Sequence, residues 1–100
     1  MTLVRQSAAT CAAQSSESLA ELLLTQMLFR TGHRAAPAEV RSWERSVPTL
    51  AQDLLEAGLG KVEMLLEYHL PLTSKRVDVV LAGRHPRSGE ASYVVVELKQ

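Results

Sequence analysis

Two apolar runs decide the fold of this chain: Lys75-Arg76-Val77-Asp78-Val79-Val80-Leu81 and Val94-Val95-Val96-Glu97-Leu98-Lys99. Both are rich in valine, which favours the extended conformation of a β-strand. Side chains alternate between the two faces of a strand, so Glu97 and Lys99 lie on the same face. Buried strands rarely carry charges without a partner, because an unpaired buried charge is costly. The pattern therefore indicates a candidate site at Asp78, Glu97 and Lys99.

The turn between the two runs predicts which of their residues face one another. If Pro86 and Gly89 close this turn, Asp78 lies opposite Glu97 in an antiparallel pair. Directly opposed side chains share a face and have Cβ atoms about 4.5–5.5 Å apart. Two carboxylates at that distance repel, so we expect a cation between them. A hard divalent ion with oxygen ligands, Mg²⁺ or Mn²⁺, suits this position.

A second turn, within residues 71–74, brings a third acid toward the same place. It places Glu67 opposite Asp78, although a slip of one residue would move Glu67 to the other face. Glu67 is therefore an additional candidate metal ligand.

These groups predict a specific chemistry. Asp78 and Glu97 would hold Mg²⁺ against a phosphodiester, where the ion polarises the phosphate and lowers the pKa of a bound water. Lys99 would orient or deprotonate that water, or neutralise charge in the transition state. Arg76 is a candidate phosphate contact. The alternative is that Glu97 and Lys99 form an ordinary surface pair on a solvated sheet face.

The rest of the chain predicts helices followed by strands. Residues 1–15 are mostly small and polar, and we expect a disordered lead-in. Residues 16–36 predict a helix and linker, with a serine cap at the start and Gly32 at the end. A second helical stretch opens at Pro37, and Pro48 either divides or kinks it.

Three strands follow the helices, at residues 63–70, 76–82 and 92–99. The predicted fold class is α/β, more narrowly α+β, with N-terminal helices followed by a three-stranded antiparallel sheet.

Composition sets limits on the class of protein. One hundred residues with zero formal charge fit one small domain, and no apolar span is long enough for a membrane helix. The single cysteine, Cys11, excludes an internal disulfide and fits a reducing cytoplasm, so we expect a cytoplasmic protein. Residues 75–100 hold five basic against three acidic residues. This weakly basic hairpin could face phosphates, although a solvated turn is the favoured interpretation.

An aspartate on one strand followed by Glu97-Leu98-Lys99 on the next resembles the PD-(D/E)XK nuclease superfamily. The core of that superfamily runs helix, three antiparallel strands, helix, strand, and residues 37–99 match the first four elements in order. A closer resemblance is to large bacterial proteins that carry such a region ahead of a Schlafen-like P-loop helicase domain. Two blocks carry this resemblance, Leu66-Glu67-Tyr68-His69-Leu70-Pro71-Leu72-Thr73-Ser74-Lys75-Arg76-Val77-Asp78 and Tyr93-Val94-Val95-Val96-Glu97-Leu98-Lys99-Gln100.

The resemblance implies a restriction-endonuclease-like core beginning in residues 37–100. It implies Mg²⁺-dependent hydrolysis of nucleic acid, most simply DNA, with Asp78, Glu97 and Lys99 as catalytic residues. Many members add an acid from the first helix, and Glu39 or Glu44 matches it. Glu44, beside Trp43, is equally consistent with the solvated side of an amphipathic helix.

Two departures from the superfamily pattern affect the prediction. Val77 replaces the proline that names the motif, and the second core helix and fourth strand are not found within residues 1–100. We therefore expect an incomplete domain, a fragment of a larger helicase- or ATPase-linked protein. The third strand then has an open edge that would take a partner strand or self-associate.

Two further functions remain open. The chain could be a non-catalytic module that keeps the nuclease shape and serves in docking or DNA contact. It could also be a small interaction protein in which residues 17–57 form a helical docking element.

Overall fold

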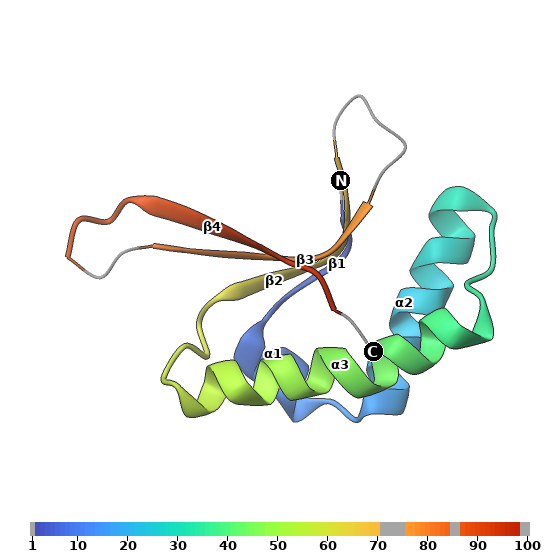
Figure 1. Ribbon diagram of the computed structural model, residues 1–100, viewed down its shortest axis with the longest axis horizontal. Coiled ribbons are helices and arrows are strands. Elements are labelled where there is room, and N and C mark those ends of the chain that lie inside the picture. Colours follow the sequence, from blue (N-terminus) through green and yellow to red (C-terminus); the bar gives the residue numbers. More distant parts are fainter. Residues whose placement is uncertain (1, 71–75, 85–86, 99–100) are drawn as a thin grey trace.

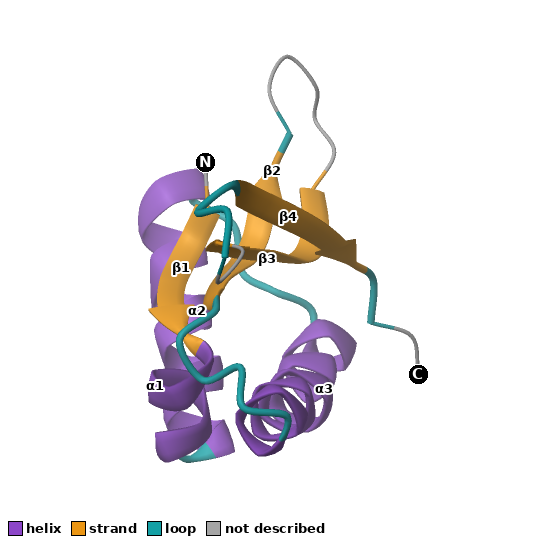
Figure 2. Ribbon diagram, turned by 90° about the vertical axis from the view of Figure 1, so that its left-hand side faces the viewer, coloured by secondary structure: helices purple, strands orange, loops and turns teal. Residues whose placement is uncertain are grey.

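A computed structural model describes residues 2–70, 76–84 and 87–98, which form an α+β fold. A four-stranded antiparallel sheet has the order β1-β2-β3-β4. Helix α3 runs below the sheet and α2 stands beside it (Figure 1), and the view turned by 90° shows the helices grouped on one side (Figure 2). The elements in chain order are β1 (Thr2–Ser7), α1 (Ala8–Ala13), α2 (Ser16–Thr31), α3 (Pro37–Glu56), β2 (Glu63–His69), β3 (Arg76–Arg84) and β4 (Ala91–Val96).

The first strand corrects the sequence-based prediction. Residues 1–15 were expected to be disordered and the sheet three-stranded, but β1 pairs with β2 and α1 follows it directly. Leu3 and Val4 are both buried, so this short strand supplies part of the core. Leu3 and Val4 are its only long apolar residues, and they are adjacent in the sequence. The segment therefore lacks the alternation of apolar and polar residues that predicts a strand. Helix α1 starts at a Ser7 cap, whose hydroxyl oxygen accepts a hydrogen bond from the Thr10 amide at 3.1 Å.

Helix α2 begins and ends as predicted. The Ser15 hydroxyl oxygen accepts a hydrogen bond from the Ser18 amide at 3.1 Å. Gly32 ends the helix in the left-handed conformation, with φ of 72°. Leu19, Leu23 and Met27 are buried along the inward face. None of the helices in the described residues is long and apolar enough to cross a membrane.

Helix α3 is continuous through Pro48, so the proline does not divide it. Pro37 occupies the first turn, where its missing N–H costs no hydrogen bond. Trp43, Val47 and Ala51 recur at helical spacing and are buried. This inward stripe of α3 covers the middle of the sheet.

The register of the last three strands agrees with the sequence prediction. Leu66 pairs with Val79, and Val79 pairs with Val96, which continues the two predicted hairpin registers. Met64, Leu66 and Val79 are essentially fully buried against the helices. Strand β4 ends at Val96, earlier than predicted, so Glu97 and Leu98 follow the strand.

Candidate functional site

Strand β2 is distorted at Glu67. Its φ of 53° is the only positive value at a non-glycine residue in the described part of the chain. This conformation is uncommon for a residue with a Cβ atom and usually costs free energy. The β1–β2 ladder passes from Val4↔Leu66 to Thr2↔Tyr68 without a Glu67 pair. A strained glutamate in the middle of a buried strand is typical of a functional position.

The side chain of Thr2 stabilises this distortion of β2. Its hydroxyl donates a hydrogen bond to the Leu66 carbonyl oxygen at 2.6 Å, next to the distorted residue. A buried carbonyl without a partner would be costly. The edge strand missed by the sequence analysis therefore supports the site directly.

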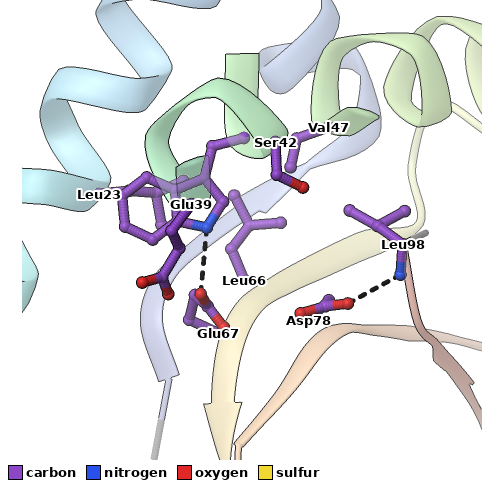
Figure 3. Close-up of a pocket in the computed structure, with 9 residues that line it drawn as sticks. Leu23, Glu39, Ser42, Val47, Leu66, Glu67, Asp78 and Leu98 are labelled. Atoms are coloured by element: carbon purple, nitrogen blue, oxygen red, sulfur yellow. Dashed lines mark hydrogen bonds between the residues drawn. The ribbon is translucent and has the colours of Figure 1, made fainter. Parts of the chain in front are cut away.

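The Glu67 carboxyl is buried between α3 and the sheet. Glu67 as a residue is 6% exposed, and Trp43 donates a hydrogen bond from Nε1 to Glu67 Oε1 at 3.0 Å (Figure 3). Glu39 lies one helical turn before Trp43 and lines the same pocket. The site thus joins two carboxyl groups that are far apart in the sequence.

Burial raises the pKa of Glu67 to about 7, because a buried carboxylate loses its solvation. The Glu39 carboxyl raises this pKa further by hydrogen bonding and by charge repulsion. The hydrogen bond from Trp43 and the positive charge of Arg76 lower it, but less strongly. Glu67 therefore gains or loses its proton near neutral pH.

Asp78 lies on β3 and lines the same pocket as Glu67. Its Oδ2 accepts a hydrogen bond from the Leu98 backbone amide at 2.7 Å (Figure 3). This short contact ties the residues after β4 to the site. The second carboxylate oxygen, Oδ1, remains for another ligand.

The resulting pocket has a volume of about 50 Å³, which is enough for a water molecule or an ion. Its polar wall comes from the carboxyl groups of Glu39, Glu67 and Asp78 and from Ser42. Oxygen donors of this kind suit a hard divalent cation. Within the described residues, however, no three Asp, Glu, His or Cys side chains are arranged so that they could hold a metal ion. The donor set therefore suits the cation in its chemistry, although the three carboxyl groups are not gathered around a single point. The apolar lining consists of Leu23, Trp43, Val47, Leu66 and Leu98.

The predicted site residues are only partly brought together. Asp78 and Glu67 line one pocket, as the register predicts, whereas Glu97 is exposed just after β4 and does not line it. Lys99 lies outside the described residues. Arg76 is exposed at the start of β3, close enough for its charge to act on Glu67.

The structure also distinguishes the two candidate acids on α3. Glu39 lines the pocket, whereas Glu44 lines a separate groove together with Glu17 and Glu21 of α2. Sequence reasoning missed the role of Trp43 as a hydrogen-bond donor. The available signal was a tryptophan on the inward stripe of a helix whose partner strand carries a glutamate.

No family model matches this chain, and neither the curated proteins nor the solved structures gave a match.

Proposed function

We propose that this chain is a metal-dependent, nuclease-like module with a restriction-endonuclease-like core that hydrolyses phosphodiester bonds of nucleic acid, most simply DNA. The observation that carries the proposal is that Glu39, Glu67 and Asp78 line one small pocket. The element order adds support, since a helix followed by three antiparallel strands runs from α3 to β4.

In this proposal Asp78 and Glu67 hold Mg²⁺ or Mn²⁺, and Glu97 completes the set when the pairing of β4 extends by one residue. The ion, when bound, polarises the phosphate and acidifies a water molecule. Asp78 Oδ1 would hold the ion, because Oδ2 accepts the hydrogen bond from the Leu98 amide. Lys99 and Arg76 would contact the anionic phosphate or the attacking water.

Glu39 has a second task in the proposal. It lines the pocket beside Glu67, so that with Glu67 and Asp78 on the ion its carboxylate can take up the proton that leaves the attacking water. Trp43 fixes the orientation of Glu67 through its N–H group, so the acceptor oxygen stays in the pocket. The carboxyl–tryptophan contact is thereby a positioning device.

The test is cleavage of single-stranded and duplex DNA, and of RNA, with Mg²⁺ or Mn²⁺ supplied at millimolar level. We expect Asp78→Asn to abolish cleavage while circular dichroism stays unchanged. Glu90→Gln, an exposed residue of the hairpin, serves as the matched control. Cleavage by Asp78→Asn at the wild-type rate would refute the assignment.

One observation favours a second function, a non-catalytic module that keeps the nuclease shape and docks or contacts DNA. Asp78 Oδ2 already accepts a hydrogen bond from the Leu98 backbone amide, and Glu97 does not line the pocket. Metal binding separates the two functions. Quenching of Trp43 fluorescence by Mn²⁺ that is lost in Asp78→Asn supports the enzyme, and its absence in the wild type supports the docking module.

A further inference from the structure

The sheet carries a second concave surface. It shares no lining residue with the pocket of Glu39, Glu67 and Asp78, which we call the acidic pocket. This groove has a volume of about 440 Å³, in the range of small-ligand sites. Charged side chains and one tyrosine surround a floor of small residues. The lining consists of Arg5, Lys61, Glu63, Ala82, Gly83, Arg84, Ala91 and Tyr93.

Strand register explains why these side chains meet. Glu63 pairs with Ala82, and Ala82 pairs with Tyr93, so the three residues form one row across the sheet. Cross-strand partners point to the same face. Met64 and Leu66, the alternate residues of β2, are buried against the helices. The row therefore lies on the face that the helices leave open.

Positive charge dominates this groove. Arg5, Lys61 and Arg84 are all exposed, and among the described residues that line the groove only Glu63 carries a carboxylate. Arg84 donates a hydrogen bond from its guanidinium to the Gly89 carbonyl oxygen at 2.9 Å, which fixes the side chain. The remaining guanidinium donors can still bind a phosphate oxygen. A chain of zero net charge thus places three cations around one groove.

Tyr93 supplies a flat apolar surface beside these cations. Its side chain is 69% exposed, and its cross-strand neighbour Ala82 is too small to cover the ring. An exposed aromatic ring next to a basic groove is the arrangement on which a nucleobase stacks while the cations follow the phosphates.

We propose that this open face binds single-stranded nucleic acid, with Arg5, Lys61 and Arg84 on successive phosphates and a base stacked on Tyr93. The choice of a nucleic acid rests on the proposed function, whereas the anion site does not. The groove would hold a strand on a surface separate from the carboxylates. Each contact is independent of base identity, so binding has little sequence preference.

The test is fluorescence anisotropy of the full chain with a labelled oligothymidylate of about twelve nucleotides. EDTA is present throughout, so the result does not depend on metal chemistry and a failure of cleavage leaves it unaffected. Arg5→Ala/Lys61→Ala and Arg5→Ala/Arg84→Ala are the test variants; the first retains the Arg84 hydrogen bond if the second folds poorly. Arg45→Ala, an exposed arginine of α3, is the matched control.

We expect both double variants to weaken binding by about tenfold or more, and the slope of log Kd against log salt to fall by about 0.7 per lost phosphate contact. Tyr93→Ala should weaken binding of the oligonucleotide but not that of inorganic polyphosphate. Three results would each overturn the proposal: no binding by the wild type, an equal loss in Arg45→Ala, or unchanged oligonucleotide binding by Tyr93→Ala.

Discussion

Replacing Glu67 with glutamine should make this protein more stable at neutral pH. The carboxyl has a pKa of about 7 in the fold against an ordinary value of 4.5. Because the folded pKa is the higher one, the folded state binds more protons between pH 4.5 and 7. The stabilising contribution of the protonated Glu67 carboxyl is therefore fully present below pH 4.5, and it is lost as the pH rises through 7. At about 1.4 kcal/mol per pKa unit, the charged carboxyl costs on the order of 3 kcal/mol at pH 8.

Glutamine is nearly isosteric, and its oxygen can still accept the hydrogen bond from Trp43. We therefore expect Glu67→Gln to match the wild type near pH 4 and to exceed it by on the order of 3 kcal/mol at pH 8. Urea unfolding followed by Trp43 fluorescence at several pH values measures this difference. Glu90→Gln, an exposed carboxyl, is the control and should follow the wild type. Parallel stability curves for wild type and Glu67→Gln would refute the reasoning.

Three other predictions address features outside this carboxyl. Thr2→Val removes the hydroxyl that donates to Leu66, and urea unfolding should show a loss of about 1–2 kcal/mol; an unchanged midpoint would mean that water replaces the hydroxyl. Val95 is 59% exposed on the edge strand, so we expect the wild type to self-associate through this edge and Val95→Lys to abolish the association. Light scattering measures this, and a wild type that stays monomeric at high concentration would contradict it. Burial raises the pKa of Cys11 to about 11, so iodoacetamide at pH 8 should modify it on the order of a hundredfold more slowly in the folded chain than in urea, and equal rates would show that the thiol is accessible.

The sequence was sufficient for features that depend on local chemistry. Ser15 and Gly32 mark the ends of α2, because a hydroxyl cap and a left-handed glycine act within one helical turn. The pairing of the last three strands also follows from the turns that join them. The position of Asp78 beside Glu67 was predictable for the same reason.

Features that depend on distant partners were not predictable. Strand β1 has a weak pattern of its own and exists because β2 offers it an edge. The left-handed conformation of Glu67 is stabilised by Thr2 and Trp43, which come from separate parts of the chain. Which α3 acid joins the site depends on how the helix is rotated on the sheet, and this selects Glu39.

Strand β4 differs from its neighbours in how it is held. All but the last of its residues are exposed, and its hairpin with β3 extends beyond the helices (Figure 1). An element with so few buried contacts opens at a lower free energy than the whole domain, and its amide hydrogens exchange early. The Leu98 amide donates a hydrogen bond to Asp78, and Leu98 also lines the acidic pocket. Each opening of β4 therefore breaks this hydrogen bond and removes Leu98 from the lining. Assembly of the site and local unfolding of the last strand are therefore a single equilibrium, and hydrogen exchange at Leu98 would measure both.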